Sequence, residues 1–139
     1  MNLGLLAAQV AQAMIGTPFR LHGRAIHHGL DCVGLIECAY AAAGHSLNLA
    51  GLYGLRNRSV AGVEASAIRQ GFAKMARLPQ PGDVLMVLTG PAQQHLLLAG
   101  PADNFIHAHA GLGRVVTSTG DLPWPVASQW HFAPKEQER

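Results

Sequence analysis

The sequence predicts an α+β fold in which helices from the first half of the chain pack on an antiparallel sheet formed by the second half. Two observations support this. Up to about residue 75 the apolar residues recur at helical spacing, and after Pro79-Gln80-Pro81-Gly82 the chain consists of short apolar and β-branched runs separated by turns. With 139 residues, 49% of them hydrophobic and 13% charged, the chain can bury a core and is too apolar to be disordered. We expect a single domain over residues 1–139.

Three helices are predicted in the first half of the chain, and the first and third lie on either side of the second. The first runs from Leu3 to Met14 and ends before Gly16-Thr17-Pro18, and the third starts at a cap on Ser59 and continues to about Met75. The segment from Phe19 to Leu30 is rich in glycine, basic residues and histidine, which predicts a loop.

The second helix has the clearest boundaries. Asp31 is a favourable N-cap residue and Gly44 stands where helices commonly stop. Between them Val33, Ile36 and Tyr40 fall on one face. We therefore expect one side of this helix to be buried.

The second half predicts a sheet. Expected strands cover Asp83–Thr89, Gln94–Ala99, Asn104–Ala110, Arg114–Ser118 and Gln129–Phe132. Gly-Pro pairs at residues 90–91 and 100–101 favour turns after the first two strands.

The charge pattern excludes several classes of function. The net charge is +2 and the basic residues are scattered, without the basic stripe that nucleic-acid binding requires. No apolar run is long enough to cross a membrane, so no membrane insertion is expected. The first fourteen residues lack the positive leading segment of a signal peptide, which predicts a protein that is cytoplasmic when made.

Cys32 is a candidate nucleophile. It follows the Asp31 cap, so its sulfur would lie in the first turn of a helix, where free amides and the helix dipole favour a thiolate. A small buried hydrophobic residue is the alternative interpretation of its position. The other cysteine, Cys38, is six positions away and faces a different direction on the helix, so no disulfide is expected.

His95 and His107 could supply the base that a cysteine nucleophile needs. His95 lies in the apolar run of its predicted strand, and His107 lies twelve residues later on the next strand. A hairpin of that length could bring the imidazoles side by side, so that His107 orients His95. His109 shares the face of His107 and competes for the orienting role. No spacing typical of a metal site is present, and neither metal nor cofactor is expected.

Five segments in order resemble the NlpC family of cell-wall cysteine peptidases. These segments are Ile15-Gly16-Thr17-Pro18-Phe19-Arg20, Asp31-Cys32-Val33-Gly34-Leu35, Pro81-Gly82-Asp83-Val84-Leu85, His95-Leu96-Leu97-Leu98-Ala99-Gly100 and Phe105-Ile106-His107-Ala108. The second is similar to the family's Asp-Cys-Ser-Gly nucleophile motif and the last to its Ile-His-Ala. The resemblance extends over nearly the whole chain.

The resemblance implies a papain-like NlpC-type fold, with N-terminal helices packed on a small antiparallel half-barrel sheet. It implies Cys32 as nucleophile, His95 as base and His107 as orienting residue, acting on peptidoglycan stem peptides, often between D-glutamate and the diamino acid. Asp31 would then help to bind the free amine of the stem, with simple helix capping as its alternative role.

Two substrate-side positions depart from the family pattern. Phe19 replaces a tyrosine whose hydroxyl assists the oxyanion site, and Val33 replaces a serine near the substrate amine. These departures keep two alternatives open: a weakly active or non-catalytic tail-tip protein that binds wall peptide, and an amidase or acyltransferase on the same fold. The start and end of the chain most resemble the phage-tail and gene-transfer-agent branch, which implies particle proteins as partners and action in the periplasm.

Overall fold

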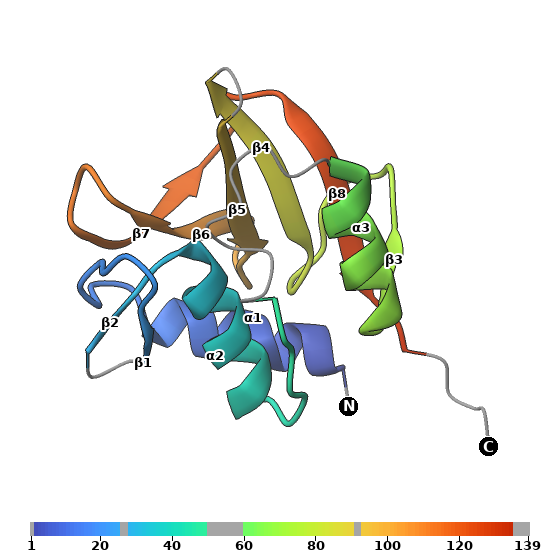
Figure 1. Cartoon of the computed structure of the whole chain (residues 1–139), viewed down its shortest axis with the longest axis horizontal. Helices are drawn as coiled ribbons and strands as arrows, with labels where there is room; N and C mark the ends of the chain where they lie inside the picture. The colour runs from blue at the N-terminus through green and yellow to red at the C-terminus, as the bar shows by residue number, and fades with distance from the viewer. Residues whose placement is uncertain (1, 26–27, 50–59, 91–92, 135–139) are drawn as a thin grey trace.

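The computed structural model describes residues 2–25, 28–49, 60–90 and 93–134. These residues form an antiparallel six-stranded sheet with helices packed against it (Figure 1). The strands, in the sheet order β3-β8-β4-β5-β6-β7, are Phe72–Lys74, Val126–Phe132, Val84–Gly90, Gln93–Ala99, Asn104–His109 and Arg114–Thr119. The α+β class with an antiparallel sheet is therefore confirmed.

The helices lie in two places in Figure 1. Helices α1 (Leu3–Ala13) and α2 (Cys32–Ala42) pack together, and α2 also contacts β5 and β6. Helix α3 (Val60–Arg69) lies beside β3 and β8 at the other end of the sheet. Within the described residues, no helix has the length and apolar character needed to cross a bilayer.

Small side chains allow α1 and its neighbours to approach closely. Ala7 and Ala11 are completely buried, and Asn2 caps the helix by accepting a hydrogen bond from the Leu5 amide at 3.1 Å. Gly82 requires the absence of a side chain because its φ is +93° and an added Cβ would lie 2.3 Å from the Gly4 carbonyl oxygen. The turn that starts β4 is thereby fixed against α1.

The sheet buries apolar residues on both faces. The face toward the helices carries Leu96, Leu98 and Ile106, which belong to the main core with Leu35 and Ile36 of α2. The opposite face carries a smaller cluster of Leu85, Val87 and Leu97, against which Phe105, Leu122 and Trp124 pack. Because side chains alternate along a strand, this second face also carries His95 and His107.

Most predicted elements are confirmed within one to three residues, and two predictions were wrong. The segment expected to be a loop contains a small hairpin of β1 (Arg24–Ala25) and β2 (Gly29–Leu30). The third helix ends at Arg69 rather than near Met75, because Gly71 takes a φ of +109° and Phe72 starts β3. The predicted cap at Ser59 lies outside the described residues.

Candidate active site

Cys32 is the first residue of α2 and Asp31 caps that helix. One carboxylate oxygen of Asp31 accepts a hydrogen bond from the Gly34 amide at 2.8 Å. The other accepts from the His22 amide at 2.7 Å, which ties the preceding loop to the helix start. The predicted cap is therefore confirmed, and it fixes the direction in which the Cys32 side chain leaves the helix.

The sulfur of Cys32 reaches the sheet at a gap between β5 and β6. The Ala99 amide donates to the Asp83 carbonyl, so odd-numbered residues of β5 bond to β4, and the Leu96 amide points toward β6. However, β5 pairs with β6 only at Leu98 and Ala99. The Leu96 amide instead donates to the Cys32 sulfur. The sulfur thus lies at the peptide bond that joins His95 to Leu96.

Burial of Cys32 opposes the effect of the helix N-terminus and favours the neutral form of the resting thiol. Burial raises the pKa of Cys32 from 9.0 to about 11, and the negative charge of Asp31 acts in the same direction. Amides of Leu96, Val33 and Cys32 itself lower the pKa, but burial outweighs them. Although the residue keeps some solvent exposure, its sulfur is surrounded by protein atoms.

The structure brings His95 and His107 together. Nε2 of His95 lies 3.2 Å from Nδ1 of His107, within hydrogen-bond distance. The ring centroid of His109 lies 5.8 Å from that of His107, but its Nδ1 accepts the Leu112 amide at 3.0 Å in its own turn. Of the two residues that the sequence left open as partners of His95, the structure therefore pairs it with His107.

Both paired imidazoles are neutral at physiological pH. Burial lowers the pKa of each ring to about 4, and the charge of His109 contributes in the same direction. Trp124 covers the pair, with its ring centroid 6.4 Å from that of His95 and 6.0 Å from that of His107. Nε2 of His107 lies 3.2 Å from the hydroxyl oxygen of Ser118.

Cys32 and His95 meet β5 at neighbouring positions, the sulfur at the edge of the strand and the imidazole on one face. Leu96 belongs to the helix-facing core, so its neighbour His95 lies on the opposite face, where it contacts Trp124. In the described part of the chain the sulfur is bonded by backbone amides, while the hydrogen bond of His95 runs to His107. Because Nε2 of His95 contacts His107, Nδ1 is the ring nitrogen of His95 that this pairing leaves for another partner.

The three predicted substrate-side residues are all partly or fully covered. Asp31 is 1% exposed and Val33 is 5% exposed and packs in the core. Phe19 packs at the edge of the same core, while its amide donates to the Gly113 carbonyl at 2.9 Å. In the structure Asp31 caps a helix, and Val33 and Phe19 pack against the core. Their contact with substrate stays a prediction.

Sequence reasoning missed Trp124 and Ser118. Both lie near His107 only because β7 and the segment after it fold back over β6, and no spacing along the chain shows this. Among the described residues, no group of three or more histidine, cysteine or acidic side chains is arranged to hold a metal ion.

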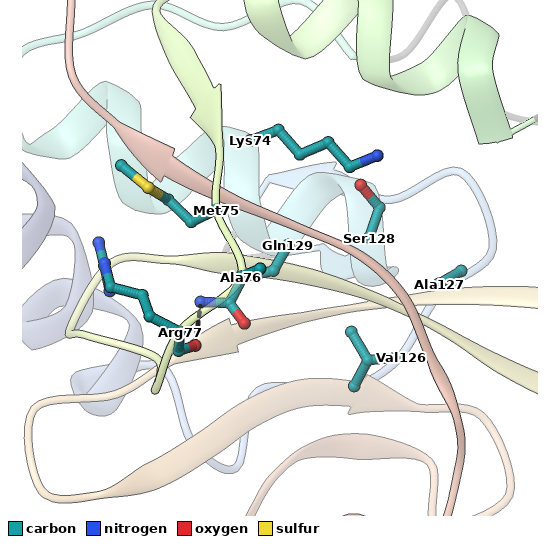
Figure 2. A pocket seen from close by; sticks show the side chains of 8 residues that line it. All are labelled: Lys74, Met75, Ala76, Arg77, Val126, Ala127, Ser128 and Gln129. Atoms are coloured by element: carbon teal, nitrogen blue, oxygen red, sulfur yellow. Dashed lines mark hydrogen bonds between the residues drawn. The ribbon is translucent and has the colours of Figure 1, made fainter.

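A separate hollow of about 440 Å³ lies at the β3–β8 side of the sheet (Figure 2). There the Gln129 side chain donates to the Arg77 carbonyl at 3.0 Å. In the sheet order β4 stands between this region and β5, so the hollow is not part of the cysteine–histidine site. Its lining residues are Lys74, Met75, Ala76, Arg77, Val126, Ala127, Ser128 and Gln129.

Comparison with known proteins finds similar structures but no similar curated sequence. The structure of NlpC2 from Trichomonas vaginalis matches with a TM-score of 0.71 and 21% identity over 94% of this chain. That of NlpC1 from the same organism matches with a TM-score of 0.65 and 20% identity, again over 94% of this chain. The match covers 48% and 45% of those chains, so this chain spans about half their length. No family model and no curated protein matches the sequence.

At this identity the likeness shows the fold. The chain has the fold of these NlpC proteins, in agreement with the NlpC-type fold that the sequence motifs implied.

Proposed function

We propose that this chain is a cysteine peptidase of bacterial cell-wall peptides, with Cys32 as nucleophile, His95 as general base and His107 as the residue that orients the base. The observation that carries the proposal is the convergence of three elements at one peptide bond. The Cys32 sulfur at the start of α2 accepts the amide that directly follows His95, and His95 in turn contacts His107.

The mechanism starts from a neutral thiol rather than from an ion pair. As the sulfur attacks the carbonyl carbon of the substrate, Nδ1 of His95 takes the thiol proton, and the carbonyl π electrons move to oxygen. The amides of Leu96, Val33 and Cys32 already reach the sulfur, and they stabilise the negative charge that the sulfur carries while its proton is leaving. This transfer requires the sulfur and Nδ1 of His95 to lie within hydrogen-bond distance in the complex with substrate.

Collapse of the tetrahedral intermediate completes the first half of the reaction. The C–N bond breaks, and the imidazolium of His95 gives its proton to the leaving amine. Water then attacks the thioester carbonyl and passes a proton to His95. The C–S bond breaks, the carboxylic acid leaves, and His95 returns the proton to the sulfur to restore the thiol. During each proton transfer the lone pair on Nδ1 of His107 can accept the Nε2–H of His95 and so stabilise its positive charge.

Purified muropeptides provide the test. We expect the wild-type chain to cut stem peptides, with products identified by mass spectrometry, and Cys32→Ala to be inactive. Cys38→Ala is the matched control, because Cys38 lies on the same helix outside the predicted site. Absence of cleavage from pH 5 to 9, while a positive-control peptidase works on the same sample, would overturn the proposal.

A second candidate function is binding of wall peptide without cleavage. The raised pKa of Cys32 favours it, and so do the sulfur's bonds to backbone amides and the bond of His95 to His107. Val33 and Phe19, which replace polar residues of the family pattern, point the same way. Calorimetric titration of muropeptides into the protein would show saturable binding with no change in the ligand's mass.

The products also separate the remaining alternatives on this fold. An amidase would release intact sugar chains and free peptide, whereas an acyltransferase would join the acyl group to an added amine. The phage-particle role implied by the motifs is tested separately, by whether the chain co-purifies with assembled particles and is protected in them from added protease.

A further inference from the structure

A hydrogen-bonded row runs from the predicted base into the sheet. It joins Nε2 of His95 to Nδ1 of His107 at 3.2 Å, and Nε2 of His107 to the hydroxyl oxygen of Ser118 at 3.2 Å. The two links use different ring nitrogens of His107. The tautomer of His95 therefore determines the tautomer of His107 and the direction of its hydrogen bond to Ser118.

Strand register places Ser118 in this row. Phe105 is the cross-strand partner of Ser118, and Val116 is the partner of His107. Ser118 is therefore the diagonal neighbour of His107 on the same face of β6 and β7. Thr119, the next residue, points to the other face and is exposed.

His107 needs a protein partner at Nε2. Its exposed fraction is 2%, and Trp124 packs against its ring. A buried imidazole nitrogen without a hydrogen-bond partner is destabilising, and Ser118 supplies the contact seen at that nitrogen.

We infer that Ser118 is a positioning residue that holds His107, and through it His95, in the arrangement needed for proton transfer; this inference rests on the proposed peptidase function. To accept the thiol proton at Nδ1, His95 must carry its own proton at Nε2. His107 must then accept at Nδ1 and carry its proton at Nε2, and that proton is donated to Ser118.

Removing the hydroxyl disturbs both imidazoles. With alanine at position 118, the Nε2–H of His107 would be buried without an acceptor. Moving that proton to Nδ1 would place it against His95, which would then have to carry its proton at Nδ1 and lose its ability to act as base. A serine also keeps the row uncharged, whereas a carboxylate at the same place would favour protonated imidazoles.

Four variants test the inference: Ser118→Ala, Ser118→Thr, Ser118→Asp and, as the matched control, Thr119→Ala. We expect Ser118→Ala to lower kcat by about ten- to a hundredfold with little change in KM. Ser118→Thr should restore kcat to within about threefold of the wild type, because threonine keeps the hydroxyl. Thr119→Ala should leave kcat unchanged.

The decisive readout does not require turnover. Nitrogen-15 NMR of the imidazoles follows the tautomers and titration of His95 and His107 in the resting protein. We expect Ser118→Asp to raise the titration midpoint of His107 by about 1–3 pH units. A folded Ser118→Asp protein with unchanged midpoints, or an unchanged kcat in Ser118→Ala, would overturn the inference. A wild-type protein that cleaves nothing, but whose imidazoles shift in Ser118→Asp, would refute the peptidase function while leaving the coupling of Ser118 to His107 intact.

Discussion

The pH dependence of Cys32 alkylation distinguishes a resting thiol from a preformed ion pair. A pKa of about 11 in place of 9.0 reduces the thiolate fraction at pH 7.5 about a hundredfold relative to an ordinary cysteine. A more basic thiolate is intrinsically more nucleophilic, which recovers about a factor of ten. We therefore expect Cys32 to react with iodoacetamide about tenfold more slowly than a free cysteine at pH 7.5.

The assay uses a Cys38→Ser background, so that Cys32 is the single thiol, and follows the mass of the alkylated protein from pH 6 to 11. The rate should rise throughout this range without a plateau below pH 10. The Cys32→Ala, Cys38→Ser double variant should not react. A rapid reaction at pH 6, with a plateau below pH 8, would show a thiolate–imidazolium pair and would refute the conclusion that burial controls this thiol.

Three further predictions concern the residues around the thiol. His95→Ala should lower kcat/KM by about a hundredfold or more and His107→Ala by less, whereas His109→Ala should stay within about threefold in the same muropeptide assay. Asp31→Ala should lower the free energy of unfolding in urea by about 2–4 kcal/mol, because it removes a helix cap and leaves buried amides unpaired. The exposed cap variant Asn2→Ala should lower it by about 1 kcal/mol. Equal losses in the two variants would contradict the assignment of Asp31 as a buried cap. Burial lowers the folded-state pKa of His95 and His107 from 6.5 to about 4, so between pH 6.5 and 4 the unfolded chain binds more protons than the folded one. The free energy of unfolding in urea should therefore fall as the pH drops from 6.5 to 4. His107→Gln should flatten this dependence, and an unchanged slope in that variant would argue against neutral buried rings.

The sequence was sufficient for elements whose signals are local. Asp31 and Gly44 bound α2 through a cap and a left-handed residue, and both act where they were expected. The spacing of His95 and His107 predicted a hairpin that brings them together, and the two rings do meet. These features depend on neighbours along the chain or on one hairpin.

Features that depend on tertiary packing could not be predicted in this way. Phe72 starts β3 rather than extending α3, because it packs against Tyr40 and Phe132 from distant parts of the chain. The pKa of Cys32 follows from how deeply the sheet buries the sulfur, which position at a helix N-terminus does not reveal. Side-chain alternation along β6 places His107 and His109 on the same face. The hydrogen bond from the Leu112 amide to His109, which distinguishes His109 from His107, depends on the turn after β6.

The most direct measurement of the central claim is the mass of the protein during turnover. A cell-wall stem peptide is mixed with the wild-type chain, the reaction is stopped with acid within seconds, and the intact protein and its peptides are weighed by mass spectrometry. The account predicts an acyl group attached to Cys32, absent from Cys32→Ala and retained in Cys38→Ala. Product formation without acylation of Cys32, or in the Cys32→Ala variant, would contradict it.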